Sequence, residues 1–156
     1  MMKGAARMNH SECDFCQIIA GKLPKVEVYR DEICIAIMDI FPTSPGHLMV
    51  IPLVHAQFSH ELTPQIRSHI FEKGSLLSGA VCRSNLMAKG ANLIINDGKA
   101  ASQHIPHLHL HVIPRYGNDL LFVLIRLFTR FFNPFVRIGL QKRLERQAED
   151  IRKALG

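Results

Sequence analysis

The stretch His107-Leu108-His109-Leu110-His111-Val112-Ile113 decides how this chain folds and which chemistry it can carry. Histidine alternates with aliphatic residues at a period of two, which is the period of a β-strand. On a strand, the three imidazoles lie on one face and the aliphatic side chains lie on the other. Successive side chains on one face are about 6.5–7 Å apart, so neighbouring imidazoles can contact one tetrahedral phosphate. The stretch therefore predicts a strand with an anion-binding face.

The segments around this strand predict an antiparallel α+β sheet. Residues 33–38 and 47–51 are predicted strands joined by a proline-containing loop, which indicates a hairpin, and Pro114 is expected to end the histidine strand. Further extended segments are expected at 26–29 and 92–96, and helices at 14–20 and 141–155. A long helix is expected to begin at Thr63 and Pro64, with an apolar stripe made of Ile66, Ile70, Phe71, Leu77 and Val81. Strand and helix do not alternate regularly, which argues against a doubly wound fold.

Length and charge limit the classes of function. The chain has 156 residues, enough for one domain with its own core, and a net charge of +6. Residues 1–114 hold ten basic and nine acidic side chains, whereas residues 115–156 hold nine and four, so the net charges of the two parts are +1 and +5. A nearly neutral main body argues against nucleic acid as the partner.

The N-terminus and the cysteines favour a cytoplasmic protein. Lys3 and Arg7 are followed by acidic residues rather than by the apolar segment of a secretory signal. The longest strictly apolar run covers residues 120–125, far short of the roughly 18–20 residues of a membrane-spanning helix. In a reducing compartment the four cysteines are expected to be thiols or ligands, and Cys13 and Cys16 form a C-x-x-C pair that can bind a metal.

Three interpretations of the histidine strand compete. The imidazoles could form a solvated surface, although three histidines next to Gln103 and His104 are an unusual set of polar groups for that. His-x-His could bind a catalytic zinc, but the nearest carboxylates, Asp97 and Asp119, are on expected loops. A neutral imidazole could also attack phosphorus and form a covalent phosphohistidine-type intermediate.

The chain resembles the histidine triad family of nucleotide hydrolases and transferases, because residues 107–113 match its His-φ-His-φ-His-φ-φ signature. The resemblance covers residues 13–55 and 92–115, and it is strongest to the branch of nucleoside phosphoramidate hydrolases with an N-terminal C-x-x-C. It implies a five-stranded antiparallel sheet with one long and one C-terminal helix, and a homodimer in which the sheet continues across the interface. We expect a single domain, with residues 11–115 as the catalytic core and residues 116–156 as a variable basic segment.

The resemblance also implies roles for four histidines. His109 matches the nucleophile that attacks the α-phosphorus, and His111 matches the side chain that contacts phosphate oxygens. His47 matches the histidine that helps to fix the position of the protons on the imidazoles. His104 departs from the family, which typically has a serine here to protonate the leaving amine. We expect His104 to be the general acid, since an imidazole titrates near neutral pH.

The nucleotide-binding residues follow from the same resemblance. Asp39 matches the carboxylate that accepts both ribose hydroxyls, although it could also be a simple turn cap before Pro42. The apolar slot for a purine ring corresponds to Phe15, Ile18, Leu23 and Ile40, any of which could be ordinary core. The residues expected near the phosphate and the leaving group are Asn96, Ser102 and Gln103.

A structural zinc ion is implied as well. Cys13 and Cys16, together with His55 and His107, match the zinc ligands of the bacterial-type branch, and a Cys2His2 set is a closed, structural site. Such a metal would tie the N-terminal segment to the histidine strand and would remove His107 from acid-base chemistry.

The expected function is hydrolysis or transfer at the α-phosphorus of a purine nucleotide through a covalent nucleotidyl-histidine, with a nucleoside 5'-phosphoramidate as the expected substrate. Two alternatives stay open: cleavage of dinucleoside polyphosphates, and a non-catalytic nucleotide-binding regulatory module. The phenylalanine-rich segment 120–140 is expected to pack on the partner subunit. Contact of this segment with an anionic membrane surface is the less favoured interpretation.

Overall fold

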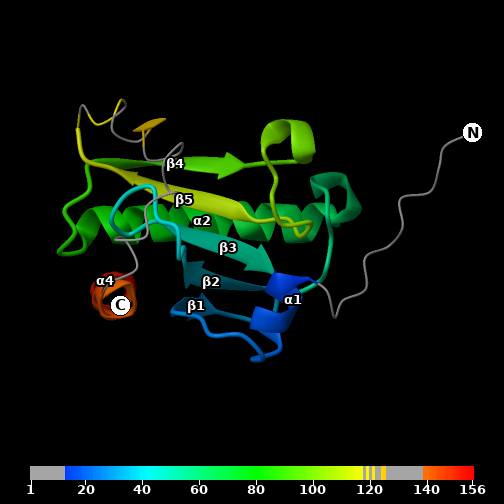
Figure 1. Cartoon of the computed structure of the whole chain (residues 1–156), viewed down its shortest axis with the longest axis horizontal. Helices are drawn as coiled ribbons and strands as arrows, with labels where there is room; N and C mark the ends of the chain where they lie inside the picture. The colour runs from blue at the N-terminus through cyan, green and yellow to red at the C-terminus, as the bar shows by residue number, and fades with distance from the viewer. Residues whose placement is uncertain (1–12, 118, 120, 122–123, 126–138) are drawn as a thin grey trace, which may run out of the picture.

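One antiparallel five-stranded sheet organises the computed structural model, which describes residues 13–117, 119, 121, 124–125 and 139–156. The strand order is β1-β2-β3-β5-β4, and all four neighbouring pairs are antiparallel (Figure 1). The elements are α1 (Asp14–Ile19), β1 (Glu27–Arg30), β2 (Cys34–Met38), β3 (Leu48–Pro52), α2 (Pro64–Arg83), β4 (Gly90–Ile95), β5 (Leu110–Arg115) and α4 (Leu140–Leu155), with short 3₁₀ turns at Ser59–Glu61 and Lys99–Ala101. The predicted α+β architecture and the β2–β3 hairpin are confirmed.

The two faces of the sheet have different partners, as the period of two predicts. Leu108, Leu110 and Val112 belong to the main core, which they form with buried residues of α2 and α4. The opposite face carries a smaller apolar cluster to which α1 contributes Phe15. Figure 1 shows α2 lying along one face of the sheet and α1 near the ends of β2 and β3. The aliphatic half of the histidine strand thus anchors it in the core, and the histidine half faces the side of α1.

Helix α2 begins as predicted, but its apolar stripe differs at one residue. Thr63 Oγ1 accepts a hydrogen bond from the backbone N–H of Ile66 at 3.3 Å, and Pro64 occupies the first turn. The prediction that Phe71 belongs to the stripe is wrong, because its side chain is 56% exposed. Phe71 follows the buried Ile70 directly, and one residue turns a helix by about 100°, which carries the ring to the solvent side. Gly74 is buried, and a Cβ there would overlap the side chain of Leu110, so this glycine permits the close approach of α2 to β5.

The prediction that Pro114 ends the histidine strand is also wrong. Strand β5 starts later than expected, at Leu110, and continues to Arg115, which pairs with Gly90 of β4. The Pro114 carbonyl accepts a hydrogen bond from Ser44 Oγ at 2.7 Å, on the side away from β4. The nitrogen and the carbonyl of one strand residue face the same neighbour, so the missing N–H of Pro114 costs no bond to β4.

Asp31 fixes the turn between β1 and β2 and connects it to α2. Its Oδ1 accepts backbone N–H groups of Ile33 and Cys34 at 2.9 and 2.8 Å, and its Oδ2 accepts the Tyr29 hydroxyl at 2.8 Å and lies 2.7 Å from His69 Nε2 of α2. Burial opposes the charged carboxylate, but these hydrogen bonds outweigh it and hold the pKa of Asp31 well below its usual range. The charged carboxylate thereby cross-links the hairpin to α2.

The C-terminal helix completes the core. Leu144, Ala148 and Ile151 of α4 are buried in the main core, and the charged residues of this helix are mostly exposed, as predicted. Most of the segment 120–140, which was predicted to pack on a partner subunit, lies outside the described residues. Within this segment, Leu121, Leu124 and Ile125 are described and are exposed. Among the described residues, no helix combines the length and the apolar character needed to cross a membrane.

Candidate active site

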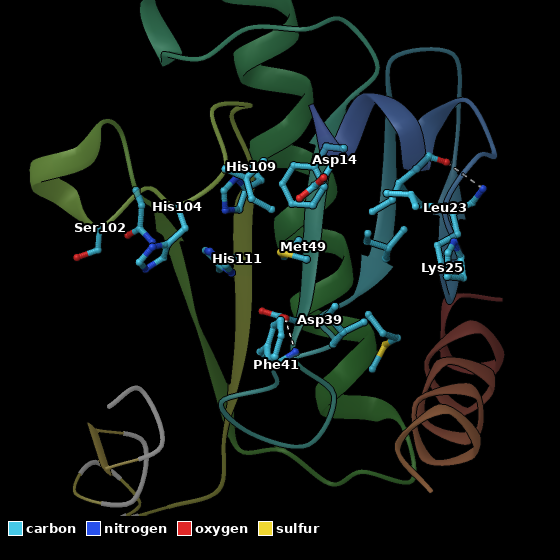
Figure 2. Close-up of a pocket in the computed structure, with 18 residues that line it drawn as sticks. Asp14, Leu23, Lys25, Asp39, Phe41, Met49, Ser102, His104, His109 and His111 are labelled. Atoms are coloured by element: carbon cyan, nitrogen blue, oxygen red, sulfur yellow. Dashed lines mark hydrogen bonds between the residues drawn. The ribbon is translucent and has the colours of Figure 1, made fainter. Parts of the chain in front are cut away.

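A cavity of about 530 Å³ lies on the α1 face of the sheet (Figure 2). Its volume is in the range of small-molecule sites. It brings together residues from α1, the end of β2, and the loop before β5, which are far apart in the sequence. Ten of the residues predicted for the site line it: Phe15, Ile18, Leu23, Asp39, Ile40, Asn96, Ser102, His104, His109 and His111.

His109 is held in one tautomer by its own strand. Its Nδ1 lies 2.8 Å from the backbone carbonyl of His107. A carbonyl oxygen only accepts hydrogen bonds, so Nδ1 carries the proton and Nε2 of the neutral ring carries the lone pair. The ring packs edge to face with Phe15, with centroids 5.0 Å apart, and is only 6% exposed. The fold therefore presents His109 as an oriented imidazole on the wall of the cavity.

His47 and His111 form a second oriented pair. The backbone N–H of Thr43 donates to His47 Nδ1 at 3.1 Å, so the proton of the neutral His47 ring is on Nε2. That Nε2–H donates to His111 Nδ1 at 3.0 Å, which places the proton of the neutral His111 ring on Nε2. His111 also lies edge to face with His109, with centroids 4.7 Å apart. The loop between β2 and β3 thus sets His111 as a hydrogen-bond donor beside the oriented His109.

Asp39 makes the contact of a turn cap and also lies at the cavity, whereas its role towards ribose stays a prediction. Its Oδ1 accepts the backbone N–H of Phe41 at 2.8 Å, which is the contact of a turn cap, and the residue also lines the cavity. Its Oδ2 lies 3.5 Å from His47 Nδ1. Because Thr43 donates to that same Nδ1, no proton lies between the two atoms when the ring is neutral.

The loop before β5 contributes two kinds of residue. Ser102 and His104 line the cavity, and both are largely exposed at the side of it that Figure 2 shows next to His111. Gln103 is buried and does not line the cavity. Its side-chain oxygen accepts the Gly98 N–H at 2.9 Å, and its amide nitrogen donates to the Gln57 carbonyl at 2.8 Å. Gln103 therefore connects this loop to the segment after β3.

The four predicted metal ligands come together next to the cavity. Cys13 Sγ and Cys16 Sγ lie 3.5 and 3.6 Å from His107 Nδ1, and Cys16 Sγ lies 3.3 Å from His55 Nδ1. All four ligand atoms are within 4.8 Å of one another. Zinc bonds of about 2.3 Å to sulfur and 2.0–2.1 Å to nitrogen, at tetrahedral angles, put sulfur and nitrogen about 3.6 Å apart. The spacing therefore fits a tetrahedral zinc ion.

The hydrogen bonds around the cluster also fit a metal. His107 Nε2 donates to the Pro52 carbonyl at 2.9 Å, which leaves the lone pair on Nδ1, facing the thiols. Burial, and then the neighbouring Cys13, raises the pKa of the Cys16 thiol to about 12. A divalent cation is then the natural means to deprotonate this thiol, because the metal binds the thiolate.

Comparisons with known proteins agree with this geometry. The sequence profile of the HIT domain matches residues 20–118. The chain belongs to the HIT family. Two curated relatives of this HIT protein have named activities. The adenylylsulfatase HINT3 of Arabidopsis thaliana is 37% identical over 111 residues, which are 71% of the chain and 56% of that protein. The adenosine 5'-monophosphoramidase hnt1 of Schizosaccharomyces pombe is 35% identical over 107 residues, 69% of the chain and 77% of that protein.

A solved structure shows the same fold with metal. The zinc-bound histidine triad family protein from Mycobacterium smegmatis superimposes with a TM-score of 0.77 at 34% identity, covering 94% of the HIT protein described here and 95% of its own chain. The zinc in this similar structure and the donor set of Cys13, Cys16, His55 and His107 are together compatible with a zinc site in the present protein.

Sequence reasoning missed eight residues of the HIT protein that line the cavity: Asp14, Pro24, Lys25, Ile37, Met38, Phe41, Met49 and Ile105. Ile37 of β2 pairs with Met49 of β3, which pairs with His111 of β5. A row of three residues across three strands thus contributes to one wall of the cavity. The alternation of β2 and β3 could have assigned Ile37 and Met49 to a face, but their register with His111 requires the folded sheet.

Proposed function

We propose that this HIT protein hydrolyses a purine nucleoside 5'-phosphoramidate through a covalent nucleotidyl-histidine on His109. Its family consists of nucleotide-binding and nucleotide-hydrolysing proteins, and the S. pombe relative is named for a phosphoramidase. The observation that carries the proposal is the hydrogen bond from His109 Nδ1 to the His107 carbonyl. It leaves the Nε2 lone pair for phosphorus, inside a cavity of nucleotide size.

The reaction has two displacement steps. His109 Nε2 attacks the α-phosphorus, the P–N bond to the leaving amine breaks, and the amine nitrogen takes a proton from the imidazolium of His104. Water then attacks the phosphorus, the bond to His109 breaks, and its electron pair returns to Nε2. The proton released by the water goes back to His104, so the enzyme is restored.

Binding uses the other predicted residues. The purine lies in the apolar slot that includes Phe15 and Ile18. Asp39 accepts one backbone N–H in its turn, and its remaining carboxylate lone pairs accept the ribose hydroxyls. His111 Nε2–H donates to a phosphate oxygen, and His47 acts as a positioning residue behind it. Gln103 holds the loop that carries His104. Both ends of its amide bond to backbone groups, and the phosphate contact that the resemblance implies stays a prediction.

Zinc has a structural role in this proposal. Cys13, Cys16, His55 and His107 would hold it, and its chemistry is to bind two thiolates and two imidazoles in a closed tetrahedral set. His107 would then connect the metal to the nucleophile, since its ring faces the thiols and its carbonyl orients His109.

The function is tested with a panel of adenosine 5'-phosphoramidate, diadenosine tetraphosphate and adenylylsulfate. We expect the phosphoramidate to be hydrolysed with the highest kcat/KM. A preference for diadenosine tetraphosphate would favour the polyphosphatase alternative instead. Tight AMP binding without turnover of any of the three would favour the non-catalytic regulatory module.

His104→Ala tests the general acid. We expect kcat/KM for phosphoramidates with an alkylamine leaving group to fall about 10²- to 10⁴-fold, because the departing amine requires a proton. Turnover of adenylylsulfate should change only a few-fold, since sulfate leaves without one. His60→Ala is the matched control, because His60 is exposed and does not line the cavity. Equal losses for both leaving groups would contradict the role of His104.

We also propose that the chain is a homodimer with the sheet continued at β4. This strand is at the edge of the sheet, and Ile94 and Ile95 on it are 39% and 41% exposed. An edge strand with exposed apolar residues readily pairs with another strand. Light scattering on the eluted protein should give twice the chain mass of 17.6 kDa, and Ile94→Lys should shift it towards the monomer. A mass of one chain at all concentrations would rule the dimer out.

A further inference from the structure

Lys25 lies at one end of the cavity, away from the catalytic histidines. Figure 2 shows Lys25 and Leu23 at one end of the row of lining residues, with Ser102 and His104 at the other end. Among the described residues that line the cavity, Lys25 is the only Lys or Arg. The phosphate end therefore relies on imidazoles, whereas the permanent positive charge is placed at the apolar end, next to residues assigned to the base slot.

Lys25 Nζ makes two contacts within the protein, and these do not use all of its N–H donors. Nζ donates to the Ile18 carbonyl at 3.4 Å and lies 3.7 Å from Glu27 Oε2. Both contacts are long, and the side chain is 21% exposed. An ammonium group has three N–H donors and no acceptor, so a further donor is left for a ligand.

The chemistry of purines makes this donor selective. Guanine presents the acceptors O6 and N7 on one edge, whereas adenine presents N7 together with an N6 amino group, which is a donor. We infer that Lys25 is a specificity-determining residue that donates to O6, and that the preferred substrates of this protein are 6-oxopurine nucleotides. The inference rests on the function proposed above. Asp14, whose carboxylate could accept from an adenine amino group, also lines the cavity, but Figure 2 shows it beside His109 rather than at the end where Lys25 lies.

A purely structural role for Lys25 makes a different prediction. Lys25 could serve only to satisfy a carbonyl at the C-terminal end of α1 and to pair with Glu27. Its replacement would then lower the stability of the protein, and any loss of binding affinity would be the same for all nucleotides. Base preference is the measurement that separates the two roles.

The test is equilibrium binding of GMP, IMP and AMP to the full-length, zinc-containing protein by calorimetry. IMP carries O6 but no 2-amino group, so it isolates the proposed contact. We expect the wild type to bind GMP and IMP about five- to tenfold more tightly than AMP, a modest factor because the ammonium is partly solvated. In Lys25→Met the three affinities should agree within about twofold, mainly because GMP and IMP bind more weakly than they do to the wild type. Lys22→Met, an exposed lysine outside the cavity lining, should keep the wild-type ratio.

A charge reversal gives a second and independent readout. In Lys25→Glu the carboxylate accepts from the N6 amino group, so AMP should now bind more tightly than IMP. An unchanged ratio in both folded variants, or a wild type that binds AMP as tightly as GMP, overturns the inference and leaves nucleotide hydrolysis intact. If none of the three nucleotides binds and no phosphoramidate is turned over, the proposed function itself is overturned.

Discussion

His109→Ala should abolish turnover, with kcat for a nucleoside phosphoramidate falling by about 10⁴-fold or more. The reason is that the variant has no atom that can form the bond to phosphorus, and water must then attack the substrate directly. His109 contributes a wall of the cavity rather than its apolar slot, so affinity for AMP or GMP should change much less than kcat. Steady-state kinetics together with calorimetry measure both quantities.

The covalent intermediate provides a control that does not depend on rates. A phosphorus–imidazole bond survives alkaline quenching, so intact-mass spectrometry of rapidly quenched wild type should detect one added nucleotide. The adduct should be absent from His109→Ala and present in His60→Ala, since His60 lies outside the cavity lining. An adduct that persists without the imidazole of His109 would assign the nucleophile to another residue.

Loss of the proposed zinc ion should be the largest perturbation of stability. We expect removal by a chelator, or Cys13→Ser, to lower the free energy of unfolding by about 3–6 kcal/mol and Tm by about 10–20 °C. Helix α1 has only six residues and no side-chain hydrogen bond at its N-terminus, so it cannot persist alone. Apart from the metal cluster, it is held chiefly by apolar packing, with Phe15 as its buried residue.

Loss of the metal should also affect nucleotide binding, because Phe15 and Ile18 of α1 line the cavity. Nucleotide affinity should therefore fall together with Tm. Cys82→Ser is the control, because Cys82 is a half-buried thiol outside the cluster. The prediction is checked by metal analysis and thermal melts of protein purified without added zinc. Well under one equivalent of zinc, with a Tm that a chelator does not change, would contradict it.

Much of the site could be predicted from the order of residues along the chain. The alternation at 107–113 placed Leu108, Leu110 and Val112 on the face opposite the imidazoles, and in the structure all three belong to the main core. The metal cluster is similar, because the ligands implied by the resemblance converge within 4.8 Å. In the first case the period of two places aliphatic side chains opposite imidazoles. In the second case the resemblance supplies the two histidines that accompany the C-x-x-C pair.

The departures have one common cause, which is that a side chain's partner lies elsewhere in the sequence. Phe71 is as apolar as its neighbours, but only the packing of α2 shows that it faces solvent. For Gln103, only the structure shows that its amide lies between the Gly98 N–H and the Gln57 carbonyl. No local sequence pattern distinguishes Lys25, and only the structure shows that it lines the cavity.

The sequence by itself predicted the type of sheet and the face of the histidines, because these depend on local periodicity, and its resemblance to the histidine triad family implied the candidate ligands. Only the tertiary structure decided the tautomers of His109 and His47, the register that aligns Met49 with His111, and the placement of a lysine at one end of the slot. These depend on hydrogen bonds and contacts that are set when distant backbone segments meet. A carbonyl 2.8 Å from an imidazole nitrogen decides where a proton lies, and residue order alone does not specify that distance.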